Sequence, residues 1–258
     1  MKSTLHEEKI PKQALVHLVR EQCEQSTIST PESIIELAFA MLDIRPGEAV
    51  GEIGSGLGGF AITASGHFPE ARFTGFEISS GALLVSLMRH YIERTDYREN
   101  LEFIQTDAFD IAKESGGTRF DKVFSNYPLS MRFQFSGIGK SYYESLQDRL
   151  VQPSFSHSGD WVFNMLIWDL MEASPTSKGL GIMTGGSSWN LTSKVMRQHF
   201  IDHGMIESIV ALPSRLFGPE NIPVMLILLS HNNTHVRLVD ATSFFHAGRR
   251  QNTLGREH

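Results

Sequence analysis

A glycine-rich stretch from Glu52 to Phe60, Glu-Ile-Gly-Ser-Gly-Leu-Gly-Gly-Phe, is the part of this chain best suited to ligand binding. It follows the apolar pair Ala49-Val50 and precedes residues that can begin a helix, which predicts a strand–loop–helix unit. Glycines such as Gly54, Gly56 and Gly58 let the backbone turn sharply and approach a ligand where a Cβ would clash. The amide groups at the start of the following helix face the same crevice.

Three acidic residues stand where predicted strands end. Glu52 opens the glycine loop, where a carboxylate repels phosphate but suits a cationic or hydroxyl-bearing ligand. Glu77 comes 25 residues later, and an acid near this spacing commonly accepts hydrogen bonds from ribose hydroxyls. A solvated strand end is the alternative for Glu77. Asp107 ends the next strand, where it can accept from an adenine amino group or cap the residues after it.

These positions favour S-adenosylmethionine as the ligand over a dinucleotide. The next residue after Glu77, Ile78, is predicted either to pack on the adenine face or to lie in the core. The loop from Gly54 to Gly59 also satisfies the G-x-G-x-x-G pattern of nicotinamide and flavin enzymes. A single match to that pattern is a weak signal, and the fourth predicted strand decides against it.

That strand runs from Asp121 to Ser125 and leads into Asn126-Tyr127-Pro128-Leu129. An exocyclic amine on a base is a poor nucleophile because its lone pair is delocalised into the ring. The Asn126 side-chain oxygen and the Tyr127 carbonyl can each accept one N–H, which aims that lone pair at a methyl sulfonium. Pro128 stiffens the turn. The sequence therefore predicts a site for methyl transfer to an amino group.

Strands and helices alternate along the chain, which indicates a parallel sheet covered on both faces. The final two strands, Ile222–Leu229 and His235–Val239, are joined by a short polar connection that contains His231–Thr234, and this predicts an antiparallel hairpin. The predicted fold class is α/β, a doubly wound, mostly parallel seven-stranded sheet with a C-terminal antiparallel hairpin. The preceding strands are predicted at Ala49–Ile53, Arg72–Glu77, Leu101–Gln105, Lys122–Ser125, Leu180–Met183 and Ile206–Leu212.

The sequence divides into three predicted parts. Residues 1–28 form an N-terminal helical segment, residues 29–245 the sheet domain, and residues 246–258 a polar tail expected to fray. The stretch Leu129–Gly159 has little periodicity and is expected to be a functional or mobile loop. A helix with an apolar face from Ile34 to Leu42 is expected to begin with Thr30 as its N-cap and Pro31 as its first residue.

Composition limits the function classes. The chain has 258 residues, a net charge of −6 and one cysteine, Cys23, which excludes an internal disulfide and suits the cytoplasm. Its longest apolar run, Val224–Leu229, is too short to cross a membrane. The histidines show no metal-ligand spacing, so no metal site is predicted. The negative charge predicts weak DNA binding by the chain alone.

Several motifs together resemble the amino-adenine-specific DNA methyltransferases, specifically the modification subunit of type I restriction–modification systems. The glycine loop, the G-x-E-I strand end at Gly75–Ile78 and the Asn126 turn carry part of this resemblance. The A-L-P…L-F…I-P stretch from Ala211 to Pro223 is its most family-specific part. Ser29-Thr30-Pro31 and Gly159–Phe163 are similar to further family motifs.

The resemblance implies a class I S-adenosylmethionine-dependent methyltransferase fold, methyl transfer to adenine in DNA, and a separate DNA-recognition (specificity) subunit as partner. Two residues depart from the family motif: Tyr127 replaces its first proline and Leu129 its aromatic residue. A non-catalytic relative that serves assembly, or a methyltransferase for another planar amine or amide, therefore remains as an alternative. The implied catalytic residues are Asn126, Tyr127 and Pro128, and the implied cofactor-binding residues are Thr30, Glu52, Gly54, Gly56, Gly58, Glu77, Ile78 and Asp107.

Overall fold

The computed structural model describes residues 16–17, 19, 29–93, 99–111, 117–129, 131, 140–150, 159–218 and 222–255. The predicted N-terminal helical segment, including Cys23, lies almost entirely outside these residues. None of the described helices is long and apolar enough to cross a membrane. The division of the chain into three parts stays a prediction.

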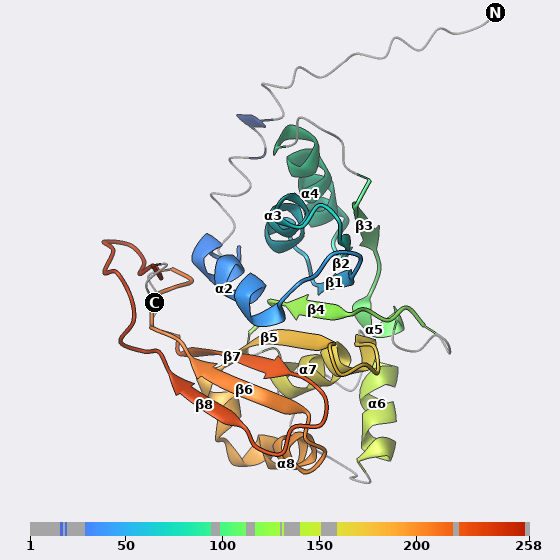
Figure 1. Cartoon of the computed structure of the whole chain (residues 1–258), viewed down its shortest axis with the longest axis vertical. Helices are drawn as coiled ribbons and strands as arrows, with labels where there is room; N and C mark the ends of the chain where they lie inside the picture. The colour runs from blue at the N-terminus through green and yellow to red at the C-terminus, as the bar shows by residue number, and fades with distance from the viewer. Residues whose placement is uncertain are drawn as a thin grey trace, which may run out of the picture.

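One sheet of eight strands organises the described structure, in the order β3-β2-β1-β4-β5-β7-β6-β8 (Figure 1). Its first five strands are mutually parallel, as the alternation of strands and helices predicts. Four of the predicted strands, at residues 49–53, 72–77, 101–105 and 122–125, have the predicted bounds. The strands are β1 (Ala49–Ile53), β2 (Arg72–Glu77), β3 (Leu101–Gln105), β4 (Lys122–Ser125), β5 (Lys178–Thr184), β6 (Ile206–Ala211), β7 (Val224–Leu229) and β8 (Arg237–Asp240).

The C-terminal part of the sheet contains the predicted antiparallel pairing, but its partners differ from the prediction. Strand β7 lies between β5 and β6 and is antiparallel to both. Strand β8 crosses beyond β6 and pairs with it in parallel, so a hairpin between β7 and β8 is wrong and the sheet has eight strands rather than seven. The apolar run in β7 gains burial from neighbours on both sides, whereas all four residues of β8 are exposed and suit an edge.

Two hydrophobic cores lie on opposite faces of the sheet. Neighbouring residues of one strand separate between them: Val123 belongs to the core with α7, and Phe124 to the core with α2 and α3. This alternation is the expected geometry of a strand buried on both faces. Figure 1 shows α2, α3 and α4 grouped together, apart from α6, α7 and α8. The helices are α2 (Glu32–Leu42), α3 (Gly59–His67), α4 (Ser80–Glu93), α5 (Ala108–Ile111), α6 (Lys140–Arg149), α7 (Gly159–Leu170) and α8 (Lys194–Asp202).

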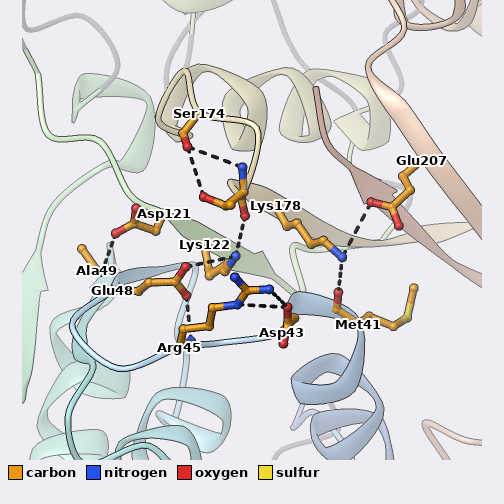
Figure 2. A network of polar contacts seen from close by, with 11 residues as sticks. Met41, Asp43, Arg45, Glu48, Ala49, Asp121, Lys122, Ser174, Lys178 and Glu207 are labelled. Atoms are coloured by element: carbon orange, nitrogen blue, oxygen red, sulfur yellow. Dashed lines mark hydrogen bonds and ion pairs between the residues drawn. The ribbon is translucent and has the colours of Figure 1, made fainter. Parts of the chain in front are cut away.

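A polar network ties together elements at the amino ends of β4 and β5 (Figure 2). The Lys122 side chain is 1% exposed, and its ammonium lies 3.3 Å from a Glu48 carboxylate oxygen. It also donates to the Thr176 carbonyl at 2.5 Å. Lys178 lies 3.7 Å from the Glu207 carboxylate on β6. Because the buried charge is paired and hydrogen-bonded, this network can fix the relative positions of these elements.

Two segments are more ordered than their composition suggests. Within Leu129–Gly159, residues 140–149 form α6, which buries Tyr142, Tyr143 and Leu146; most of the remainder lies outside the described residues. In the tail, the Asn252 backbone N–H donates to the Arg215 carbonyl at 2.8 Å, and its side chain donates to the Ser214 carbonyl at 2.9 Å. The buried Asn252 therefore attaches the described part of the tail to a turn that is distant in the sequence.

Candidate functional site

A cavity of about 390 Å³ opens at the carboxyl ends of β1, β2, β3 and β4. The strand order reverses at β1 and β4, which is where open α/β sheets form their ligand crevices. The structure brings to this cavity all but one of the predicted site residues. Those lining it are Thr30, Glu52, Gly54, Gly56, Glu77, Ile78, Asp107, Asn126, Tyr127 and Pro128.

The glycine loop has the backbone that its sequence predicts. Gly54 and Gly56 have φ angles of 65° and 54°, which favour glycine. A Cβ on Gly54 would point into open space, so the absence of a side chain leaves room for a ligand. Gly58 is the predicted site residue that does not line the cavity. With φ at 74°, it is the N-cap of α3 and packs closely, because a Cβ at this position would lie 2.9 Å from the Phe103 ring.

Glu77 shapes this loop from the neighbouring strand. Its two carboxylate oxygens accept hydrogen bonds from the Gly56 N–H at 2.8 Å and the Ser79 N–H at 2.7 Å. The residue is buried, so it is not a solvated strand end. Each carboxylate oxygen has two acceptor sites, so both can still accept from a ligand hydroxyl.

Glu52 is an acid buried beneath the cavity. One carboxyl oxygen accepts from the Ala61 N–H at 3.0 Å in the first turn of α3. Burial raises the pKa of Glu52 to about 8, although the Ala61 hydrogen bond and the Arg89 charge favour the ionised form. The negative charge of Glu77 raises this pKa further. A cationic ligand beside Glu52 would compensate the buried charge and favour ionisation.

Asp107 and Ile78 lie on the β3 side of the cavity. The Asp107 carboxylate accepts from the Phe109 N–H at 3.0 Å, so it caps α5 while also lining the cavity. Ile78 is 48% exposed, which places it on the cavity wall rather than in the core. Its apolar surface can pack against a planar ring.

Thr30 and Asn126 meet in the cavity although 96 residues separate them. The Asn126 side-chain N–H donates to the Thr30 hydroxyl at 3.0 Å, while Pro31 rather than Thr30 occupies the N-cap of α2. The prediction that Thr30 caps this helix is therefore wrong. With its amide nitrogen held by Thr30, Asn126 keeps its carbonyl oxygen as the acceptor for a substrate amine.

Tyr127 has a buried side chain and is not a stacking surface for a base. Its ring is 1% exposed and stacks on Phe163, with centroids 4.8 Å apart and an interplanar angle of 7°. Its hydroxyl accepts from the Asn164 amide at 3.1 Å. Burial, aided by the nearby Asp160 charge, raises the pKa of Tyr127 well above its ordinary value, so the hydroxyl stays protonated. These contacts fix the Asn126–Pro128 turn to α7.

The contribution of α7 was not predicted from the sequence. Phe163 lines the cavity, Asn164 holds Tyr127, and Asp160 is fully buried at the start of the same helix. Two polar residues four positions apart in the mainly apolar first half of this helix are the available signal, since buried polar groups require partners. Their partners come from other elements and cannot be read from local sequence.

The charges around the cavity select the type of ligand. The described residues that line it include the carboxylates of Glu52, Glu77 and Asp107 but no lysine, arginine or histidine. Such a lining disfavours the pyrophosphate of a dinucleotide and favours a ligand with a cationic group and hydroxyls. S-adenosylmethionine fits these acceptor groups, the open space at Gly54 and the cavity size.

A family comparison agrees with this geometry. The sequence profile of the N-6 DNA methylases matches residues 16–258. The chain belongs to the N-6 DNA methylase family. Its resemblance to this class of methyltransferase, inferred from sequence motifs, is thus confirmed. None of the curated proteins matches the sequence of this N-6 DNA methylase at a significant level.

Solved structures share the fold of this N-6 DNA methylase. The methyltransferase subunit of a type I restriction–modification system from Streptococcus thermophilus has a TM-score of 0.78 at 18% identity, covering 100% of this chain and 57% of that one. A modification subunit ascribed to a type I restriction enzyme of Vibrio vulnificus YJ016 has a TM-score of 0.70 at 17% identity, covering 95% and 55%. A protein from Listeria monocytogenes, ascribed to the class I S-adenosylmethionine-dependent methyltransferases, has a TM-score of 0.66 at 13% identity, covering 90% and 72%. The chain spans little more than half the length of the two type I subunits.

Proposed function

We propose that this chain transfers a methyl group from S-adenosylmethionine to the exocyclic amino group of adenine in DNA. The observation that carries the proposal is the Asn126 amide, which is held by Thr30 in the wall of a cavity lined by carboxylates. Membership of the N-6 DNA methylase family supports the same reaction.

The cofactor half of the site follows from charge and hydrogen-bonding capacity. Glu77 accepts from the ribose hydroxyls with the second acceptor site of each oxygen. Glu52 compensates a cationic group of the cofactor, and Asp107 accepts from its adenine amino group. When bound, S-adenosylmethionine supplies a methyl group activated by a sulfonium.

The substrate half activates and orients the amine. The Asn126 side-chain oxygen and the Tyr127 backbone carbonyl each accept one N–H, which directs the nitrogen lone pair towards the methyl group. The Tyr127 side chain keeps its own carbonyl in place through Phe163 and Asn164. Replacement of the motif's proline by tyrosine therefore retains the required backbone acceptor. Pro128 restricts the next φ angle.

DNA recognition would require a second component. The net charge of −6 opposes tight binding to phosphate, and the chain spans little more than half of the type I subunits that it resembles. We therefore propose that it acts in the cytoplasm with a separate DNA-recognition subunit, as part of a restriction–modification assembly.

Transfer of labelled methyl groups tests the reaction. The wild-type chain and Asn126→Ala would be incubated with methyl-labelled S-adenosylmethionine and a library of random-sequence duplex and single-stranded DNA. Nucleoside analysis should find the label on the amino group of adenine with the wild type. The variant should transfer at least about a hundred-fold more slowly, because removal of one transition-state acceptor has this typical effect.

Cofactor titration provides the control for this test. Asn126→Ala should bind S-adenosylmethionine within about three-fold of the wild type, since the acceptor role concerns the amine rather than the cofactor. A wild-type chain that binds cofactor but labels no adenine in either form of DNA would refute catalysis and leave a binding module. Label on another base would refute the adenine assignment.

A further inference from the structure

Two large apolar side chains project from the loop that follows β5. Trp189 is 74% exposed and Leu191 is 86% exposed. Trp189 lies between two short 3-10 turns, Gly185–Ser188 and Leu191–Ser193, and Leu191 is the first residue of the second turn. The two other tryptophans of the chain are different, because Trp161 is fully buried and Trp168 packs against His231. Exposure of such large groups is costly unless they meet a partner.

The first half of this loop is fixed by a buried carboxylate. One oxygen of Asp160 accepts from the Thr184 N–H at 3.1 Å, the Thr184 hydroxyl at 2.6 Å and the Ser187 hydroxyl at 2.6 Å. The Trp161 indole N–H donates to the Ser187 carbonyl at 2.9 Å. The backbone two residues before Trp189 is thus tied to the start of α7.

The second half is fixed from α8. The Asn190 side chain accepts from the Ser193 N–H at 2.8 Å, and Arg197 donates to the Asn190 carbonyl at 3.2 Å. Trp189 therefore projects from a backbone held on both sides. A held backbone lowers the entropy cost of presenting this ring to a partner.

This loop lies at the edge of the sheet where the proposed catalytic cavity opens. Strand β5 runs parallel to β4, so Thr184 at its end lies at the same edge of the sheet as Asn126. The same helix that holds the loop through Asp160 places Phe163 in the cavity wall and against Tyr127. The loop that carries the exposed ring therefore lies at the same edge of the sheet as the cavity and is held by a helix that contributes to the cavity wall.

The local charge favours a nucleic acid as the partner. From Gly185 to Arg197 the chain has two basic residues and no acidic one, although its net charge is −6. Lys194 is exposed and begins α8, whose N-terminal amides add positive potential. A base can stack on the indole while phosphates lie near Lys194 and this helix end.

We propose that Trp189, with Leu191 beside it, is a stacking wedge for the DNA bases adjacent to the adenine that enters the cavity. This inference rests on the proposed function for the identity of the partner. Removing a base from the stack leaves a gap and exposes the faces of its neighbours. A flat indole and a branched apolar side chain fill that gap, as apolar wedges do in other DNA-bending proteins.

Tryptophan fluorescence gives a direct test, because Trp189 is the exposed indole of the three. The probe is a single-stranded oligodeoxyadenylate, whose bases are accessible for stacking. Binding of the oligonucleotide should quench the tryptophan emission of the wild type and protect it from quenching by acrylamide. Neither effect should be seen with Trp189→Phe. By a matched anisotropy titration at low salt, Trp189→Ala should bind about ten-fold more weakly, whereas Trp189→Phe should stay within about three-fold.

Leu238→Ala is the matched control, since Leu238 is 75% exposed on the far edge strand β8 and should not change binding. Equal affinity of Trp189→Ala and wild type would overturn the proposal, as would unchanged emission with the oligonucleotide in excess. Either result would assign the exposed ring to a protein contact instead. Methyl transfer is measured separately, so stacking without transfer would refute only the proposed function, and transfer unaffected by Trp189→Ala would refute only the wedge.

Discussion

Glu52→Gln should stabilise the ligand-free protein at neutral pH while weakening its binding of S-adenosylmethionine. The folded-state pKa of Glu52 is about 8, against an ordinary value of 4.5, because burial disfavours the charge. Because the pKa of Glu52 is higher in the folded than in the unfolded protein, its contribution to stability is fully present below the unfolded-state pKa. This contribution is lost as the pH rises towards 8. Between the unfolded-state pKa and pH 7 the unfolding free energy falls by about 1.4 kcal/mol per pH unit, which amounts to about 3 kcal/mol at pH 7. Glutamine keeps an acceptor for the Ala61 N–H and removes the charge.

Urea unfolding of both proteins between pH 4 and pH 8.5 measures this difference. The two stabilities should be similar at pH 4, and the glutamine variant should become progressively more stable as pH rises. Other titrating groups are common to both proteins and cancel in the comparison. A difference that stays constant across this range would show that Glu52 ionises as an ordinary surface acid, which would refute the buried-charge argument.

Cofactor binding should show the opposite effect of the same substitution. A group with a pKa of about 8 is roughly 90% protonated at pH 7, so a cation that forces its ionisation releases about 0.9 proton. Calorimetry in two buffers with different ionisation enthalpies measures the proton release, and the wild type should release about this much more than Glu52→Gln. The variant should also bind less tightly. Equal proton release by both proteins would mean that Glu52 does not face the cationic group.

Four further substitutions separate the roles of other buried groups. Glu77→Gln should weaken S-adenosylmethionine binding about ten-fold or more by calorimetry, because charge-assisted hydrogen bonds to the ribose are lost; unchanged affinity would limit Glu77 to shaping the loop. Tyr127→Phe should lose about 1–2 kcal/mol of stability and slow methyl transfer, whereas Tyr142→Phe, which removes a buried hydroxyl bonded to Asp169 at 2.6 Å, should lose stability without slowing transfer. Equal transfer rates in the two tyrosine variants would show that the hydrogen bond from Asn164 to the Tyr127 hydroxyl does not position the Asn126–Pro128 turn for methyl transfer. Lys122→Met should lower the unfolding free energy by about 3 kcal/mol and leave cofactor affinity unchanged, since it unpairs Glu48 at the opposite end of the sheet; a large loss of affinity would contradict this separation.

The local sequence was sufficient to predict most of the residues that line the cavity. Short apolar runs bounded by turn residues define β2, β3 and β4, and their ends place Glu77, Asp107 and Asn126. Parallel strands bring their carboxyl ends to one edge, so the three side chains were expected to meet without knowledge of any contact. The positive φ angles at Gly54 and Gly56 follow from glycine itself.

The partners of these side chains were decided only by the tertiary structure. Thr30 is a residue type that often caps helices, but its hydroxyl accepts a hydrogen bond from the side chain of Asn126, 96 residues away. Tyr127 could have been a stacking surface, but Phe163 and Asn164 bury it. Capping and strand formation depend on a few neighbouring residues, and the sequence shows those directly. Burial depends on which distant element packs above a residue, and the chain specifies that only through its packing as a whole.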